Sequence, residues 1–145
     1  MAAALLSRRA GVIEIDTTRY PLLIQRWTGA PTNENLDAYF VQADDIADYA
    51  IAHHSYYVVV VTGSLNITAS GRKYLGAWID TVPRARRERT IASYVVIDNA
   101  ALRGMLTALG WLTRNLQDVH PVATEAEGIR RAAEHLRSDV RTRSL

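Results

Sequence analysis

The chain has 145 residues, enough for one globular domain with a single hydrophobic core. Hydrophobic residues make up 48% and charged residues 22%, a composition that excludes a disordered chain. No cysteine is present, which excludes a disulfide framework and a thiolate metal site. No apolar run is long enough to span a membrane, and the basic pair Arg8–Arg9 follows the short apolar start, unlike in a signal peptide. We therefore expect a cytoplasmic protein without a cofactor.

The formal net charge of +2 conceals an uneven distribution along the chain. Residues 1–60 hold four arginines and seven acidic residues, a balance of −3, whereas residues 61–145 hold thirteen basic and eight acidic residues, a balance of +5. The densest basic run contains Arg84, Arg86, Arg87 and Arg89. These arginines either stabilise the end of a helix through its dipole or contact an anionic partner. No base-stacking aromatic residue lies within the run, so we expect no nucleic-acid partner.

Two strands and a helix are predicted at the start of the chain. Val12–Asp16 and Tyr20–Trp27 are apolar runs separated by three residues, which indicates a hairpin. A long amphipathic helix follows and ends near His53, with acidic residues opposite its apolar stripe. Thr32 or Asn33 is expected to cap the start of that helix.

The central element is Tyr56–Val61, a run of six aromatic or β-branched residues. Such a run is typical of a strand that is buried on both faces of a sheet. The next helix is expected to begin near Ser70, a suitable N-cap. Because ligands of open α/β sheets bind beyond the carboxyl ends of strands, we expect a site in this loop and helix. The candidate partner or ligand residues there are Ser64, Thr68, Gly71, Tyr74 and Trp78.

The second half of the chain continues the alternation of strands and helices. Thr90–Ile97 predicts another buried strand, and Val119–Ala123 a short one whose Pro121 indicates a sheet edge. Thr124 and Glu127 have the spacing of a capping box before the last helix. A helix is also predicted between these two strands, with core positions at Leu102, Met105, Leu106, Leu109 and Leu112.

The predicted order of elements is therefore β-β-α-β-α-β-α-β-α. An opening hairpin followed by β-α repeats indicates a single α/β domain with a mixed sheet and covering helices. We assign residues 1–11 to an N-terminal extension, residues 12–140 to the domain and residues 141–145 to a C-terminal tail.

Three short sequence motifs occur within these predicted elements: Ala69-Ser70-Gly71, Val95-Val96-Ile97-Asp98 and Thr124-Glu125-Ala126-Glu127-Gly128-Ile129. Together they resemble the STAS superfamily, and more closely its SpoIIAA-like branch of STAS/SEC14-domain proteins. The resemblance extends over nearly the whole chain, from about Val12 to Leu136. It implies the SpoIIAA-like α/β fold.

The resemblance also implies a function. In anti-sigma-factor antagonists of the superfamily, the helix after the central strand begins with Asp-Ser-Ser-Gly, and a partner kinase phosphorylates the serine before the glycine. Ser70 and Gly71 match these two positions, while Thr68 and Ala69 stand where the aspartate and the first serine would be. We therefore expect a non-enzymatic regulatory module with a protein partner of the anti-sigma-factor or kinase type, switched by phosphorylation of Ser70. The alternative is that Ser70 only caps the helix.

The sequence also offers two alternatives to a regulatory module. The SEC14-like comparison and the aromatic residues suggest binding of a lipid or small apolar ligand between the sheet and a movable helix. An enzyme is less favoured, since Ser64 lacks a Gly-x-Ser-x-Gly setting and no glycine-rich phosphate loop is present. The adjacent His53 and His54 point in different directions on a helix, and His120 and His135 lack ligand spacing, so no metal site is expected.

The last expectation concerns self-association. Two sheet edges are expected, at Val119–Ala123 and near the opening hairpin, and Pro121 and Pro21 would blunt both. A weak homodimer would then use helix faces, with the acidic first half against the basic second half. Because such an interface is partly ionic, we expect salt to shift the equilibrium toward the monomer.

Overall fold

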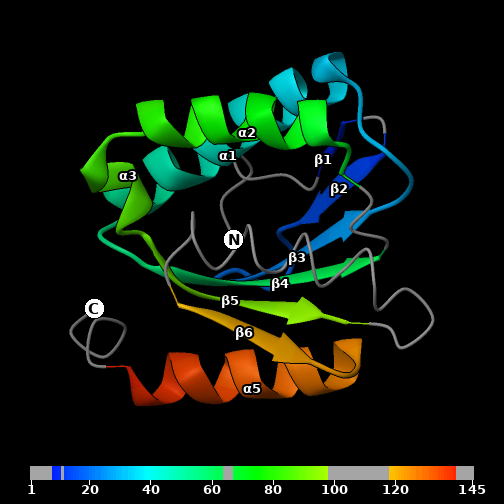
Figure 1. Ribbon diagram of the computed structural model, residues 1–145. Helices are drawn as coiled ribbons and strands as arrows, with labels where there is room; N and C mark the ends of the chain where they lie inside the picture. Colours follow the sequence, from blue (N-terminus) through cyan, green and yellow to red (C-terminus); the bar gives the residue numbers. More distant parts are fainter. Residues whose placement is uncertain (1–7, 11, 64–66, 98–117, 140–145) are drawn as a thin grey trace.

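The computed structural model describes residues 8–10, 12–63, 67–97 and 118–139. Six strands form one mixed sheet in the order β1-β2-β3-β4-β5-β6 (Figure 1). The first three strands pair antiparallel, and β3 to β6 pair parallel. This confirms a single α/β domain with a mixed sheet. The strands are β1 (Arg8–Ala10), β2 (Ile13–Asp16), β3 (Leu22–Trp27), β4 (Tyr57–Gly63), β5 (Thr90–Val96) and β6 (Val119–Val122).

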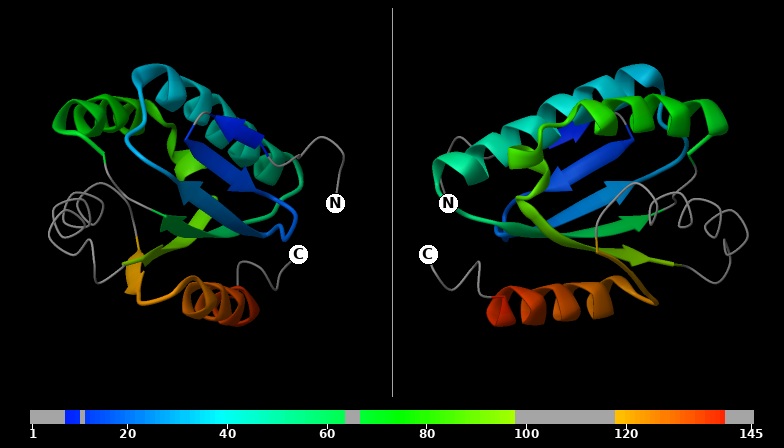
Figure 2. Two further views of the ribbon diagram at one scale, coloured as in Figure 1. Left: turned by 90° about the vertical axis from the view of Figure 1, so that its right-hand side faces the viewer. Right: turned by 60° about the vertical axis from the view of Figure 1, so that its left-hand side comes forward.

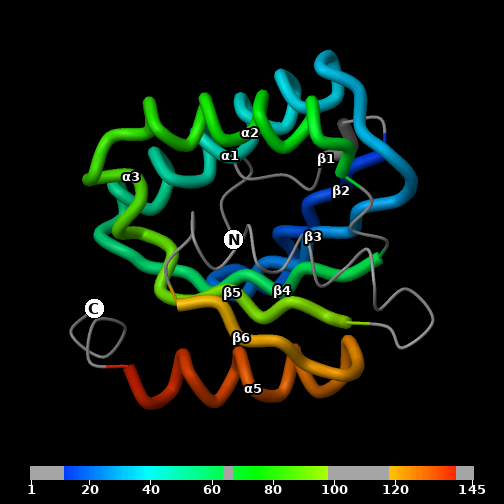
Figure 3. The backbone as a smooth tube through the Cα atoms, in the orientation of Figure 1, coloured from blue at the N-terminus to red at the C-terminus, as the bar shows by residue number. Residues whose placement is uncertain are grey.

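Helices cover both faces of this sheet. The described helices are α1 (Asn33–Ala52), α2 (Ala69–Thr81), α3 (Arg84–Arg87) and α5 (Glu125–Ser138). Figure 2 shows α1, α2 and α3 over one face and α5 against the opposite face. The backbone trace in Figure 3 shows the same layers, with α1 and α2 side by side. The helix predicted around Leu102 to Leu112 lies outside the described residues.

The central strand β4 is buried on both faces, as its unbroken apolar run predicts. Val58 and Val60 are fully buried in the cluster beneath α5. Tyr57 and Val59 point the other way and pack in the cluster beneath α1. Alternation of side chains along a strand sends successive residues into different cores, so a strand between two helical layers must be apolar throughout.

Two expectations about the sheet edges turn out differently. Arg8–Ala10, assigned to an extension, forms β1 and pairs with β2. Pro21 does not blunt an edge, because β3 lies between β2 and β4 and the Pro21 carbonyl accepts a hydrogen bond from Val58 N (3.0 Å). The expectation for Pro121 is confirmed, since β6 is an edge of the described sheet.

Threonine side chains cap the long helices. Thr32 caps α1: its Oγ1 accepts from Asn35 N (3.1 Å), and Asn35 Oδ1 accepts from Thr32 N (3.0 Å). Thr124 caps α5, with Oγ1 accepting from Glu127 N (3.1 Å). The Glu127 carboxylate reaches one residue further than in a standard capping box and accepts from Ala123 N (3.0 Å).

Among the described helices, none combines the length and the apolar character needed to cross a bilayer. The longest, α1, has 20 residues but carries acidic residues along its outer face.

Candidate functional site

The start of α2 differs from the expected one. Thr68 is the N-cap: it has extended backbone angles (φ −64°, ψ 164°), and its Oγ1 accepts from Gly71 N (3.1 Å). The prediction that Ser70 caps the helix is therefore wrong. Ser70 lies in the first turn, exposed, with its Oγ 3.2 Å from Thr68 Oγ1. Ser64 lies outside the described residues.

The other predicted residues of α2 hold this helix against its neighbours. Gly71 is buried, and a Cβ there would lie 3.1 Å from the Ile67 side chain, so its smallness lets the first turn pack closely. Tyr74 Oη donates a hydrogen bond to the carboxylate of Asp37 on α1. Trp78 stacks on a phenylalanine of α1, with ring centroids 4.5 Å apart and planes inclined by 6°. Tyr74 and Trp78 therefore join α2 to α1.

The basic run forms its own helical turn instead of ending α2. Helix α2 ends at Thr81, and Pro83 occupies the N-cap position of α3, where its lack of an N–H is tolerated. The arginines therefore belong to a new helical turn. Arg84 Nε pairs with Glu88 Oε1 at 2.6 Å. Arg89 donates to the Ser55 carbonyl (3.3 Å). Most of these arginines thus have partners inside the chain.

Arg86 joins α3 to the acidic face of α1. It donates two hydrogen bonds to the Asp48 carboxylate, at 2.9 and 3.1 Å, and lies 3.4 Å from the Asp44 carboxylate. Acids of the first half and a base of the second half therefore meet within one chain. The predicted salt-sensitive homodimer stays a prediction.

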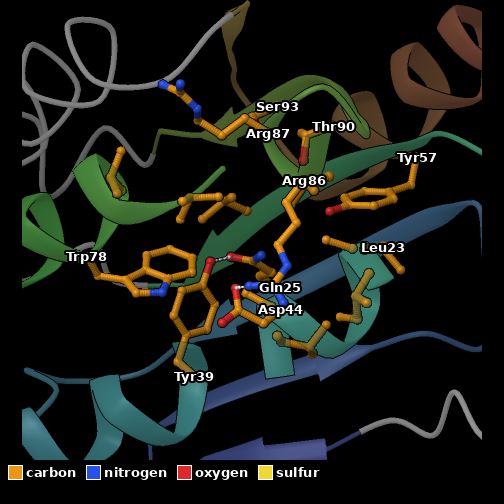
Figure 4. A pocket seen from close by; sticks show the side chains of 18 residues that line it. Leu23, Gln25, Tyr39, Asp44, Tyr57, Trp78, Arg86, Arg87, Thr90 and Ser93 are labelled. Carbon is orange, nitrogen blue, oxygen red and sulfur yellow. Dashed lines mark hydrogen bonds and ion pairs between the residues drawn. The ribbon is translucent and has the colours of Figure 1, made fainter. Parts of the chain in front are cut away.

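A cavity of about 370 Å³ lies between the sheet and the layer formed by α1, α2 and α3 (Figure 4). Its walls are mostly apolar side chains from both layers. The apolar residues include Ile15, Leu23, Val59, Val61, Ile46, Ala47, Ile79 and Val82. A largely apolar hollow with a few polar groups is the usual form of a small-molecule site.

Two polar side chains of the sheet, Gln25 and Ser93, face this cavity and are 9% and 7% exposed. Gln25 Oε1 accepts from Tyr39 Oη (3.3 Å) and from Trp27 Nε1 (3.2 Å). The Gln25 amide also carries an NH2 group and Ser93 a hydroxyl, and both residues line the cavity. Both groups can therefore donate to a ligand.

A bulge shapes one end of the cavity. Tyr57 pairs with Thr90 while the next residue, Val58, pairs with Ala92, so Ile91 is the extra residue of β5. This irregularity directs Thr90 toward the cavity, where its side chain hydrogen-bonds with the Tyr57 phenol. Burial raises the pKa of Tyr57 to about 12, and the Thr90 hydrogen bond opposes that shift. Tyr57 therefore stays protonated at neutral pH.

Charged groups stand at the rim rather than in the interior. Figure 4 shows Arg86 reaching toward Asp44, while the Arg87 guanidinium points away from Tyr39 and Gln25. Burial raises the pKa of the Asp44 carboxyl, and the Arg86 guanidinium lowers it. Arg86 has two carboxylate partners on α1, Asp44 and Asp48, which offset its positive charge.

The cavity lies between the sheet and a helical layer, as expected for the apolar-ligand alternative, but does not coincide with the loop and helix start expected for the regulatory site. It lies against Tyr57 and Thr90 at the amino ends of β4 and β5, whereas the expected position was beyond the carboxyl end of β4. Of the predicted residues that the structure describes, Trp78, Arg86 and Arg87 line it.

The sequence analysis missed Gln25 and Ser93. Ser93 is the single polar residue of the run Ile91–Val96, and Gln25 is the buried one of two polar residues, with Arg26, in Leu22–Trp27. A polar side chain in such a position must find a partner or face a polar space, so this pattern was the available signal.

Comparison with protein-family models, curated proteins and solved structures finds no match for this chain. The resemblance to the STAS superfamily therefore stays a prediction.

Proposed function

We propose that the protein is a binding module for a small, mainly apolar ligand that carries a hydrogen-bond acceptor. The cavity between the sheet and the α1–α2 layer is the observation that carries this proposal. Its volume of about 370 Å³ falls at the lower end of the range for ligand pockets, roughly 300–1,000 Å³. The volume suits a compact molecule or part of one acyl chain better than a whole two-chain lipid.

The polar groups of the cavity indicate the chemistry of the ligand. The Gln25 amide and the Ser93 hydroxyl both offer a donor from the sheet, two strands apart. A carbonyl or ether oxygen would accept from either, and its apolar body would contact Val59, Val61 and Ile79. Because Asp44 and Asp48 already neutralise Arg86, a neutral ligand is favoured over an anionic one.

Prodan, a naphthyl ketone dye whose emission reports polarity, tests the proposal. We expect saturable binding at one dye per chain with emission shifted to the blue. Ala47 is 3% exposed and lines the cavity, so Ala47→Leu should fill part of it and weaken binding at least about tenfold. Ser93→Ala should weaken binding about three- to tenfold, since it removes one donor.

Ala126→Leu is the matched control, because Ala126 is an exposed residue of α5 and the change adds the same side chain outside the cavity. Its affinity should equal that of the natural protein. Unsaturable dye binding, or equal affinity in Ala47→Leu and the natural protein, would contradict the proposal. Native mass spectrometry of the purified chain provides a second measurement, in which a co-purified small molecule supports it.

A second candidate function is the phosphorylation-switched interaction module. The observation that favours it is that Thr68, and not Ser70, caps α2. The Ser70 hydroxyl is exposed and is not required to satisfy a backbone N–H of the helix start. A phosphate there would add about two negative charges near the positive end of the helix dipole and would change what docks on α2.

Phosphopeptide analysis of the protein from its own cells tests this second function. Modification of Ser70, and a partner of the anti-sigma-factor or kinase type that distinguishes Ser70→Asp from Ser70→Ala, are the expected results. An unmodified Ser70 under every growth condition would exclude the switch.

A further inference from the structure

Three side chains with metal-binding atoms gather on the sheet face opposite the cavity. Asp118 and His120 lie at the start of β6, and His135 lies in the last turn of α5. One ligand atom from each lies within 4.8 Å of the others. The sequence spacing suggested no metal site, because His135 is far from His120 along the chain. The packing of α5 on the sheet brings them together.

The backbone and an aromatic ring fix this arrangement. Asp118 lies just before β6 in a left-handed backbone conformation (φ 52°), and its Oδ1 lies 2.6 Å from His120 Nε2. The Asp118 carbonyl accepts from Ser93 N (3.0 Å). Tyr94 pairs with His120 in the β5–β6 register, and their rings stack with centroids 4.9 Å apart and planes at 18°. Tyr94 also meets His135 edge to face, at 6.0 Å between centroids.

The ring nitrogens are arranged as metal ligands are. His135 Nδ1 lies 2.8 Å from Tyr94 Oη. If Nδ1 donates to that oxygen, the lone pair is on Nε2, which lies 3.7 Å from a carboxylate oxygen of Asp139. His120 Nε2 lies 2.6 Å from Asp118 Oδ1, yet within the described part of the chain this buried nitrogen has no partner with hydrogen-bond geometry. The nitrogen of His120 and the oxygen of Asp118 thus approach each other without hydrogen-bond alignment. Two atoms that coordinate the same metal ion are arranged in this way.

We propose that Asp118, His120 and His135 bind a divalent transition-metal ion, with Zn²⁺ as the best match. Two imidazole nitrogens and one carboxylate oxygen suit Zn²⁺, Co²⁺, Ni²⁺ or Cu²⁺ better than Mg²⁺ or Ca²⁺, which prefer oxygen ligands. Zinc–ligand bonds of about 2.0–2.2 Å in a tetrahedral site place the ligand atoms roughly 3.4 Å from one another. Small side-chain rotations are therefore enough to bring the three ligand atoms to these distances.

The surroundings fit a partly open site. The side chain of Asp118 is 44% exposed, that of His120 32% and that of His135 22%. Water or another ligand can therefore reach the ion. Three protein ligands leave a fourth position for such a molecule. The Arg131 guanidinium lies 5.3 Å from the Tyr94 ring centroid, and an Asp139 carboxylate oxygen lies 3.7 Å from His135 Nε2.

Tyr94 has a positioning role in this proposal. Its hydroxyl hydrogen-bonds with His135 Nδ1, which orients the ring and leaves Nε2 as the nitrogen for the ion in this proposal. This metal site does not depend on the proposed ligand cavity, since the two lie on opposite faces of the sheet.

Zn²⁺ titration of the untagged full chain by calorimetry, after removal of metals with a chelator, tests the proposal. We expect one ion per chain, and Co²⁺ should give the visible absorption of a tetrahedral site. His120→Ala should abolish stoichiometric binding. Tyr94→Phe keeps the ring but loses the hydroxyl, and should weaken binding about 10- to 100-fold.

The double variant His53→Ala, His54→Ala is the matched control, because it removes two histidines near the end of α1. It should bind Zn²⁺ like the natural protein. Asp118→Asn, which keeps the side-chain shape, replaces His120→Ala if that variant does not fold, and should also weaken binding. Absence of saturable binding to the natural protein, or equal loss in the control variant, would overturn the proposal.

Discussion

The two faces of the sheet are packed in different ways. On the α5 face, Gly128 sits so close to the sheet that a Cβ there would lie 3.1 Å from a methyl group of Val60 and 3.3 Å from one of Val122. On the other face, Val59 and Ala47 border a cavity of about 370 Å³. The same strand β4 thus contributes one side to a close-packed core and the other to a hollow.

The difference follows from which side chains separate the helix from the sheet. A glycine lets α5 approach β4 directly. On the cavity face, the rings of Tyr39 and Trp78 stand between the helices and the sheet, 6.1 Å apart between centroids. Close packing stabilises the domain, whereas a hollow loses contacts that only a ligand restores. One face therefore serves stability, and the other can serve binding.

The largest expected effect compares two neighbouring valines of β4. Val60→Ala should lower the free energy of unfolding by about 2–3 kcal/mol, because it opens a new void beneath α5. Val59→Ala should cost only about 1 kcal/mol, since Val59 already borders a cavity. Urea denaturation of both variants measures the difference. Equal losses would mean that the two faces are equally well packed.

The pH dependence of stability tests the burial of Tyr57 on the cavity face. Its pKa is about 12 in the folded protein and 10.0 in its ordinary state. Between these pH values only the unfolded chain releases the proton, so the stabilisation is complete below pH 10.0 and is lost as the pH rises to about 12. We expect a loss on the order of 2 kcal/mol, measured by urea denaturation across this range.

Tyr57→Phe should reduce that pH dependence, while Tyr20 and Tyr39, whose pKa values burial also raises, keep part of it. Tyr94→Phe is the matched variant on the α5 face. Burial also raises the pKa of Tyr94, but Arg131 lowers it, so this variant should change the slope less. The same slope in the natural protein and Tyr57→Phe would show that Tyr57 is not shielded from water.

A third prediction places the same larger side chain on both faces. Ala47→Leu should leave stability unchanged or raise it by about 1 kcal/mol, because the new methyl groups enter the cavity. Ala132 is fully buried beneath the sheet on α5, so Ala132→Leu should destabilise by about 1–3 kcal/mol through overpacking. Thermal and urea unfolding measure both. A destabilised Ala47→Leu would mean that the hollow cannot accept a side chain.

The smallest expected effect concerns the two helix caps. Thr68 and Thr124 each accept a backbone hydrogen bond at 3.1 Å, and replacing either by alanine should cost about 1 kcal/mol. Only Thr68→Ala should also change prodan affinity, because α2 covers the cavity and α5 does not. Amide hydrogen exchange should quicken at the start of α2 in one variant and of α5 in the other. An altered affinity in Thr124→Ala would contradict the separation of the two faces.

Local patterns were enough to predict most of the elements. The unbroken run around Val58–Val60 identified a strand buried on both faces, and the stripe from Leu36 to Ala50 identified a long helix. The fold class followed from the order of these elements. Such features are encoded within a few neighbouring residues, which is why periodicity and capping residues reveal them.

Tertiary packing decided what the local patterns left open. Ser70 and Thr68 are both suitable caps, and the backbone conformation selected Thr68. The arrangement of strands placed Pro21 at the start of an interior strand, β3, although its sequence setting suggested an edge.

Both candidate sites also arise only in the folded chain. Gln25 and Ser93 come to face one hollow from separate strands, and His120 meets His135 through the packing of α5. Local sequence governs the conformation of each element. The spacing between elements depends on which side chains fill the contacts, such as Gly128 on one face, and that spacing places these groups together.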